Sequence, residues 1–472
     1  MSSTEAIDYS APAERISVTG LARNGAVAGI IKLASAGLSF AMFLAVALVT
    51  DERQFGLFSA AYAGASLVSF FASVGQQSVV LRFWPQYAGA GQKGVANSLM
   101  LRSILVAMGG LVATSAGLVL VGMLPGFSVA TPEWLPLCCA AALLSLALGW
   151  SEFASGAFRA KSVLVGALLP RDVVWRALVL LATGGLYVTH GSTDAVTVTL
   201  LTAGLLLLSV LPQAVLRSPA IGSTEASVRA VLLLRDTLRL ERTPLSLEQK
   251  REFRSVTLGL WGATSLPPAL GQVSTLLVAA ILGPEVAGAV FVADRTTRVV
   301  LLALTGINQA LAPEISGAYY SGDTEHVQRI TSLTALGASV VAVLTLAVFA
   351  AFGPFILRIF DPAYATPGTH AVLIIFALGA SFAAACGPIE LLSHLTGLQN
   401  SLLKVLVAVN AIGLCVTALA TWQLGPPGAA ASIAGTLIVW NSISVGIAKR
   451  RIGIDSSVLG LLRLPAGRRV LG

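Results

Sequence analysis

Twelve long apolar segments constrain the fold of this chain more than any other feature of its sequence. A helix needs about 20 mostly apolar residues to cross the hydrocarbon core of a bilayer, and turn-forming or charged stretches separate one segment from the next. The segments cover residues 24–49, 56–77, 99–123, 135–158, 165–189, 195–216, 256–282, 287–311, 330–352, 370–393, 403–423 and 428–448. We therefore predict an all-α, polytopic membrane protein with 12 transmembrane helices.

The composition excludes a soluble protein of ordinary type. Of the 472 residues, 56% are hydrophobic and only 11% are charged, against about 25% charged residues in soluble proteins. The mean hydropathy is +0.83. The four cysteines have neither metal-ligand spacing nor the pattern of a disulfide framework, and no nucleotide-binding or metalloenzyme motif is present. We expect no cofactor, no metal and no catalytic activity.

The basic residues predict the orientation of the chain in the membrane. If both termini are cytoplasmic, most of the 30 lysine and arginine residues fall in inside segments, and only Arg53, Arg295, Arg298 and Arg358 fall outside. Cytoplasmic loops carry such an excess in membrane proteins. The net charge of +8 is then explained by basic loops beside anionic lipid, and nucleic acid is not an expected partner.

The longest polar stretch lies in the middle of the chain and divides the predicted helices into six and six. The predicted organisation is a cytoplasmic N-terminal tail (1–22), a first six-helix lobe (23–216), a basic cytoplasmic linker (217–255), a second lobe (256–448) and a basic cytoplasmic tail (449–472). The offset that aligns Gly56 with Gly288 also aligns Tyr87 with Tyr319. Two repeats of parallel orientation are typical of transporters whose substrate site lies between the halves.

Charged residues inside the predicted spans are the candidates for function, because each costs about 2.5–3.5 kcal/mol at the centre of a membrane helix. The cationic candidates for a substrate cavity are Lys32, Arg171, Arg176, Arg295 and Arg298. A simpler interpretation is available for each. Lys32 could reach the nearby interface, and the i,i+4 pairs Asp172–Arg176 and Asp294–Arg298 could be structural, which leaves Arg171 without a local partner.

Three acidic residues are candidates for ion or proton coupling, namely Glu152, Asp294 and Glu390. The simpler interpretation of such an acid is an ion pair with an arginine of a neighbouring helix. Three prolines are candidates for kinks or gates, since proline removes a backbone donor and bends or breaks a helix. They are Pro267 and Pro268 in the seventh span, and Pro388 in the tenth.

Several short motifs resemble the O-antigen (Wzx-type) polysaccharide flippases, a family within the multidrug/oligosaccharidyl-lipid/polysaccharide exporter superfamily. In that family an acidic loop and an aromatic-Gly-x-aromatic motif open the second helix, and an arginine ends it. Residues 55–58 (FGLF) and Arg82 match this pattern. Residues 282–300 and the stretch after Pro313 resemble the corresponding part of the second half.

The resemblance implies a two-lobed inner-membrane transporter with a partly cationic central cavity. Such a protein would turn a polyprenyl-pyrophosphate-linked oligosaccharide from the cytoplasmic to the outer leaflet for surface polysaccharide biosynthesis. Its partners would be this substrate and membrane lipids, together with a polysaccharide polymerase and chain-length proteins. The cationic candidates suit a pyrophosphate, which arginine binds well in a low-dielectric groove.

Two alternatives remain open at this point. A multidrug or cation exporter of the same superfamily would call for a prominent intramembrane acid in the first half, where this chain has Lys32. A membrane-embedded polysaccharide polymerase would need a large outer loop with acids and arginines. The largest predicted outer loop, residues 353–369, has only Arg358 and Asp361.

Overall fold

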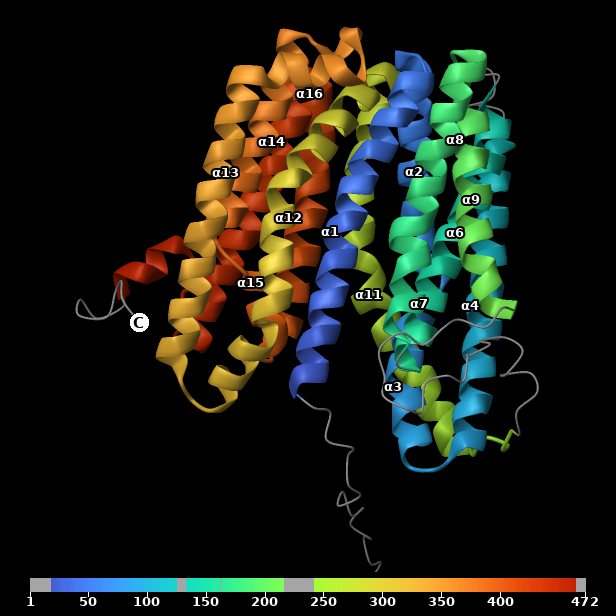
Figure 1. The fold of residues 1–472 in the computed structure, drawn as a ribbon, viewed down its shortest axis with the longest axis vertical. Helices are drawn as coiled ribbons and strands as arrows, with labels where there is room; N and C mark the ends of the chain where they lie inside the picture. Colours follow the sequence, from blue (N-terminus) through green and yellow to red (C-terminus); the bar gives the residue numbers. More distant parts are fainter. Residues whose placement is uncertain (1–17, 125–132, 162, 216–241, 464–472) are drawn as a thin grey trace, which may run out of the picture.

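The protein is a bundle of helices in two lobes that stand side by side (Figure 1). The computed structural model describes residues 18–124, 133–161, 163–215 and 242–463, and every regular element within them is a helix. The predicted all-α fold in two lobes is therefore confirmed. Residues 1–17 of the predicted N-terminal tail lie outside the described residues, as does most of the predicted linker, and helix α1 already begins at Val18.

The first lobe contains the helices of the first half of the chain. They are α1 (Val18–Val49), α2 (Glu52–Ala72), α3 (Gln76–Gly89), α4 (Lys93–Gly122), α6 (Trp134–Ala160), α7 (Leu164–Leu169), the π-helical turn η1 (Pro170–Val174), α8 (Trp175–His190) and α9 (Ala195–Val215). Helix α2 begins where it does because the Asp51 side chain accepts a hydrogen bond from the Gln54 backbone N–H, which satisfies one of the free donors at a helix N-terminus.

The second lobe follows the same plan. It contains α11 (Leu247–Leu282), α12 (Pro284–Tyr320), α13 (Thr324–Phe360), the short 3-10 helix η2 (Pro362–Tyr364), α14 (Pro367–Ala385), α15 (Ile389–Leu395), α16 (Gln399–Arg451) and η3 (Val458–Arg463). Helix α16 comprises two helices joined at a kink, where Gly425 leaves the helical conformation. A capping box between Ser246 and Gln249 starts α11, within the stretch that the sequence assigned to the linker.

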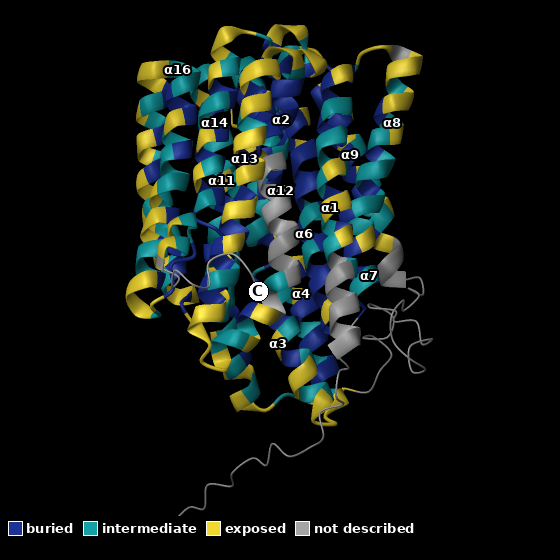
Figure 2. Cartoon of the chain, turned by 60° about the vertical axis from the view of Figure 1, so that its left-hand side comes forward, coloured by how far each residue is buried: buried dark blue, intermediate teal, exposed yellow. Residues whose placement is uncertain are grey.

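Each predicted span corresponds to one helix, to consecutive helices or to one half of α16. Among the described residues, eight helices are long and apolar enough to cross a membrane, and α16 with its 53 residues supplies two of the predicted spans. The outer faces of the helices carry exposed large apolar side chains, such as Val343, Leu344, Phe352 and Phe355 on α13. Figure 2 shows these exposed faces around a buried interior, as expected of a bundle that lipid surrounds.

Within the described ranges, non-helical residues interrupt two of the predicted spans, and the sequence predicted only one of these breaks. Gly387, at a φ of 71°, separates α14 from α15 directly before Pro388. The other break separates α2 from α3 at Val74 and Gly75, which have φ values of 51° and 69°. A β-branched residue in this left-handed region is strained. Pro267 and Pro268, by contrast, lie inside the continuous helix α11, so the helix is not interrupted there, and a kink or gate at these prolines stays a prediction.

The two lobes meet where equivalent residues of the two repeats touch. A Cβ atom on Gly288 of α12 would lie 3.2 Å from the Cα of Gly56 of α2. These are the glycines that the sequence offset aligns, and equivalent residues can touch one another only close to the axis that relates the repeats. The absence of side chains on both allows α2 and α12 to cross at this point.

The segment after α16 folds back along the second lobe. The Asp455 backbone N–H donates to the Gln328 side chain at 2.7 Å, and the Asp455 carbonyl accepts from it at 2.6 Å. The Ser456 hydroxyl donates to the Cys386 carbonyl at 2.8 Å, beside the break before α15. We call residues 452–463 the C-terminal strap. The sequence placed this segment in a cytoplasmic tail, and nothing in its composition predicted that it would pack.

Candidate functional site

Two adjoining cavities lie between the lobes, and we treat them together as the central cavity. Their volumes are about 160 Å³ and about 200 Å³. Both are lined by Tyr62, Arg176 and Arg295. Further polar lining residues are Ser39, Ser66, Ser69, Ser151, Glu152, Arg171, Gln272 and Arg298. One polar space inside an apolar bundle is thus lined from α1, α2, α6, η1, α8, α11 and α12.

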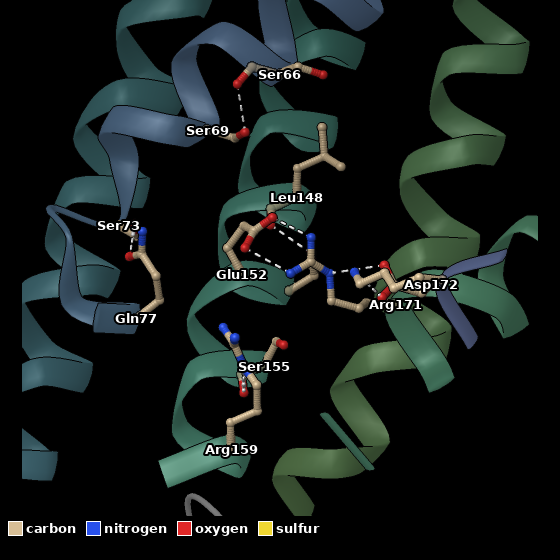
Figure 3. A network of polar contacts seen from close by, with 12 residues as sticks. Ser66, Ser69, Ser73, Gln77, Leu148, Glu152, Ser155, Arg159, Arg171 and Asp172 are labelled. Atoms are coloured by element: carbon tan, nitrogen blue, oxygen red, sulfur yellow. Dashed lines mark hydrogen bonds and ion pairs between the residues drawn. The ribbon is translucent and has the colours of Figure 1, made fainter. Parts of the chain in front are cut away.

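On the first-lobe wall, Arg171 is neutralised by acids. Its Nη1 donates to Glu152 Oε2 at 2.8 Å, and its Nη2 contacts Glu152 Oε1. Figure 3 shows the two side chains facing each other across the gap between α6 and η1. Asp172 adds a longer contact at 3.6 Å. Such a two-point contact between guanidinium and carboxylate fixes the geometry of both groups. Arg171 therefore does have an ion-pair partner, Glu152, which lies on a neighbouring helix.

The π-helical turn η1 explains the position of Arg176. A π turn widens the helix and leaves carbonyl groups without their usual i→i+4 donor. Arg176 Nη1 donates to the Asp172 carbonyl at 2.6 Å and to the Arg171 carbonyl at 3.2 Å. The predicted i,i+4 pair with the Asp172 carboxylate is longer, at 3.8 Å. The Arg176 Nε is buried and has no hydrogen-bond partner among the described residues.

Lys32 pairs with Asp172. Its Nζ lies 2.6 Å from Asp172 Oδ2, and the two residues are 140 positions apart in the chain. The Asp172 side chain is only 4% exposed, whereas that of Lys32 is 37% exposed. Lys32 is not among the residues that line the central cavity. This ion pair joins α1 to η1, and it places Lys32 beside the cavity wall.

On the second-lobe wall, Arg295 is held by aromatic rings. Its guanidinium carbon lies 4.6 Å from the centroid of the Phe291 ring and 5.3 Å from that of the Phe43 ring. Within the described part of the chain it forms no ion pair, and its buried Nε has no hydrogen-bond partner. Cation–π contacts of this kind hold a charge in place while leaving its N–H donors available.

Arg298, one turn further along α12, has an acid of its own. Its Nε donates to Asp294 Oδ2 at 2.9 Å, as the i,i+4 spacing predicted. The Arg298 side chain is half exposed, and it lines the central cavity on the side of the second lobe. Around the cavity as a whole, cations outnumber carboxylates, because Asp172 is shared between Lys32 and two arginines.

The end of the cavity at which α2 and α12 begin is closed. The Phe43 ring lies 5.1 Å from the Phe291 ring, and Phe55 contacts both Phe291 and Tyr364 at 6.2 Å. The Tyr364 hydroxyl donates to the Glu52 carbonyl at 3.5 Å. Burial, together with nearby carboxylates led by that of Glu52, raises the pKa of Tyr364, so its hydroxyl stays protonated. The sequence predicts that this closed end faces outward.

The remaining candidates lie away from the cavity. Glu390 is on α15, where its side chain is 67% exposed and 4.0 Å from His394. Pro267, Pro268 and Pro388 are not among the cavity-lining residues. Of the acidic candidates, Glu152 lines the central cavity and Asp294 pairs with an arginine that lines it. No group of His, Cys, Asp and Glu in the described ranges could hold a metal ion.

Several cavity residues were not among the sequence candidates. Tyr62 and Gln272 are polar residues in the middle of apolar segments, a signal that the sequence offered and that a search restricted to charges overlooked. The roles of Phe43 and Phe291 had no such signal, because one more phenylalanine in a membrane helix resembles any other. Only the packing of α1 on α12 brings the two rings to Arg295.

No family model and no curated protein sequence matches this chain, but solved transporter structures do. An inward-facing multidrug resistance MATE family transporter of the MOP superfamily superposes with a TM-score of 0.69 at 15% identity, covering 91% of this chain and 98% of that one. The outward-facing form of a multidrug resistance MATE family transporter gives a TM-score of 0.60 at 16% identity, with 92% and 98% covered.

A third solved structure is similar to the same extent. It is a MOP superfamily transporter from Pyrococcus furiosus, described as having a binding pocket of reverse polarity that suggests a different function. It gives a TM-score of 0.60 at 15% identity and covers 92% of this chain and 95% of its own. The chain therefore has the two-lobed helical fold that MATE family transporters of the MOP superfamily also have.

Proposed function

We propose that this protein is an inner-membrane transporter that moves a polyprenyl-pyrophosphate-linked oligosaccharide across the bilayer by alternating access, for the synthesis of a surface polysaccharide. The observation that carries the proposal is the state of Arg295. Among the described residues this guanidinium has no acidic partner, and it is held by Phe43 and Phe291 beside a cavity that it shares with Arg176. Such a group is suited to bind an anion that enters from outside the protein.

The arrangement suits a pyrophosphate in particular. Arg176 and Arg295 approach the cavity from opposite lobes, so a group with several anionic oxygens can contact both. The hydroxyls of Tyr62 and Ser66 offer further donors. The polyprenyl chain would stay in the lipid, while the sugars cross between the lobes. Opening of the Gly56–Gly288 contact would then release the substrate at the outer side.

The similarity to multidrug transporters favours a second candidate, an exporter of organic cations. The polarity of the cavity argues against it, because the described cavity residues include more cations than acids. A positively charged drug would be repelled by Arg176 and Arg295 and would find Glu152 already paired with Arg171.

The test is a transport assay in proteoliposomes that contain the purified full chain. The substrate is the polyprenyl-pyrophosphate-linked oligosaccharide extracted from the bacterium that makes the protein, and a membrane-impermeant glycosidase reports which leaflet it occupies. We expect the pool of substrate that is protected from the glycosidase to be lost only when the protein is present, and to be lost roughly 10–100-fold more slowly with Arg295→Gln. Absence of flipping, together with uptake of a cationic dye, would instead identify the exporter.

A gene deletion in the same bacterium provides an independent check. We expect surface polysaccharide to be lost while complete repeat units accumulate on the cytoplasmic leaflet, and the wild-type gene should reverse both effects. Normal polysaccharide in the deletion strain, combined with an inactive protein in proteoliposomes, would rule out the proposed function.

A further inference from the structure

A separate pocket lies inside the second lobe, with a volume of about 250 Å³. It is enclosed by α11, α12, α14 and the two halves of α16. Arg298 lines both this pocket and the central cavity, so the two spaces adjoin. A ligand that is bound at Arg295 through one end could therefore reach into the second lobe with the other. We call this space the second-lobe pocket.

The walls of the second-lobe pocket are of two kinds. One kind is aromatic, with the rings of Phe291, Phe376 and Trp440. The other kind carries hydroxyl and amide groups. These polar residues are Ser274, Thr275, Thr297, Asn410, Thr417 and Thr436.

Thr436 and Asn410 in the polar wall present acceptor oxygens to a ligand. The Thr436 hydroxyl donates to the Ser432 carbonyl at 2.8 Å, and the Asn410 Nδ2 donates to the Leu406 carbonyl at 2.8 Å. Each group thus spends a donor on its own helix and keeps oxygen lone pairs for a ligand. The charges of the pocket cancel, because Asp294 is paired with Arg298. A neutral ligand rich in hydroxyl donors fits this chemistry better than an ion does.

We propose that the second-lobe pocket is a saccharide subsite, which holds a sugar ring of the substrate while Arg176 and Arg295 hold its pyrophosphate. The inference rests on the proposed function and extends it. The apolar face of the sugar packs against Trp440, and its hydroxyls donate to Asn410 and Thr436. The volume is smaller than the roughly 300–1,000 Å³ of pockets for drug-sized ligands, so the pocket takes one or two sugar rings rather than a whole repeat unit.

The division of the ligand between two spaces has a physical reason. A pyrophosphate needs unpaired cations, which the central cavity offers at Arg295. A sugar has no charge, so a cationic wall would add little to its binding affinity. Stacking and oriented hydrogen bonds provide its affinity and specificity instead. The second-lobe pocket therefore determines which sugar is accepted, and the central cavity only requires a pyrophosphate.

The experiment measures the binding of two probes to the purified full chain, by microscale thermophoresis. One probe is undecaprenyl pyrophosphate without sugar, and the other is the glycosylated lipid extracted from the host bacterium. For the wild type we expect the glycosylated lipid to bind about tenfold more tightly. Trp440→Leu and Asn410→Leu should reduce this ratio to less than about twofold, with the affinity for undecaprenyl pyrophosphate unchanged.

Trp422→Leu is the matched control, because Trp422 is also on α16 but has a side chain that is exposed on the outside of the bundle. This variant should keep the full wild-type ratio between the affinities for the two probes. Asn410→Leu is a second variant in case Trp440→Leu does not fold, and the melting temperature of each variant checks this point. A variant that weakens both probes equally would contradict a sugar-specific role.

The outcomes separate the two proposals. If the wild type binds both probes with equal affinity, the saccharide subsite is wrong but the transport of a pyrophosphate lipid stands. If neither probe binds, the proposed function is wrong and the subsite is wrong with it. If only the glycosylated probe loses affinity in the Trp440 and Asn410 variants, both proposals are supported.

Discussion

Arg171 and Arg295, on the two walls of the central cavity, are held in opposite ways. On the first-lobe wall, Arg171 is matched by Glu152, and Asp172 is shared with Lys32. On the second-lobe wall, Arg295 lies between two phenyl rings and has no acid among the described residues. A buried charge that is already paired contributes to structure, whereas one that is held but unpaired is available to a ligand. The comparison predicts that charge removal destabilises the first lobe and inactivates the second.

The largest effect should follow from Asp172→Asn. This change leaves Lys32, Arg171 and Arg176 without their shared acid in the membrane interior. Breaking a buried ion pair costs about 3–5 kcal/mol, and we expect the free energy of unfolding to fall by about 3 kcal/mol, because the partly exposed Lys32 can reach the interface. Reversible unfolding in mixed micelles measures the loss.

Two variants decide whether the Asp172 effect arises from an uncompensated charge. The double variant Lys32→Met/Asp172→Asn should recover much of the lost stability, since it leaves fewer buried cations unmatched. Glu252→Gln is the control, because Glu252 and Arg82 form a largely exposed pair at 3.3 Å, and such pairs contribute less than about 1 kcal/mol. Equal losses for Asp172→Asn and Glu252→Gln would contradict the comparison.

Arg295→Gln should show the reverse pattern, a large loss of transport with little loss of stability. A hydrogen bond to a charged group is worth about 1.5–3 kcal/mol, so transport of the pyrophosphate lipid should fall by roughly 10–100-fold. The melting temperature should stay within a degree or two of the wild type, because no acid is left unpaired. Arg295→Lys should recover part of the transport. A destabilised Arg295→Gln protein would show that the rings alone do not explain this site.

Gln328→Leu should have a smaller effect, confined to the stability of the second lobe. The variant removes the side chain that donates to the Asp455 carbonyl and accepts from its N–H. A hydrogen bond of this kind contributes about 1 kcal/mol, and binding of undecaprenyl pyrophosphate should not change. Hydrogen exchange at Asp455 measures the effect directly, and unchanged protection there would mean that the strap does not depend on Gln328.

Asp294→Asn should have the smallest effect on folding. Asp294 pairs with the half-exposed Arg298, and pairs of this kind contribute about 0.2–1 kcal/mol. The variant adds one net positive charge beside the central cavity, so the anionic lipid should bind somewhat more tightly, by less than about tenfold. Weaker binding would indicate that Asp294 itself contacts the substrate, as the second-lobe pocket allows.

The sequence predicted the helices well, because they follow from local rules, whereas the binding role of the intramembrane charges stays a prediction. Apolar length identifies a span, and the cost of an intramembrane charge singles out Arg171, Arg176, Arg295 and Arg298, all of which line the central cavity. The pairing of these charges was beyond local rules. Spacing along one helix suggested Asp172 with Arg176, while helix packing gave Asp172 its shortest contact with Lys32.

The breaks between consecutive helices show a similar limit to what the local sequence predicts. The Gly387-Pro388 break is marked by residues that disfavour a helix, and the structure has a break there. Val74 disfavours a helix far less than glycine or proline does, yet its positive φ separates α2 from α3. Here the contact of Gly75 with the Trp261 backbone and the hydrogen bond from Trp261 Nε1 to the Phe71 carbonyl hold a conformation that the local sequence does not favour. Which end of the bundle faces the cytoplasm stays a prediction from the basic residues.

The C-terminal strap has a consequence for biogenesis. Protein chains fold in order of synthesis, and the strap follows every helix of the lobe that it covers. While α13 to α16 enter the membrane, Gln328 and the Cys386 carbonyl must therefore wait without the partners that Asp455 and Ser456 later provide. The second lobe therefore passes through an intermediate in which the strap has not yet packed. A ribosome that stalls before residue 455 leaves a lobe whose helices are inserted but whose strap is missing, and quality-control proteases can recognise it.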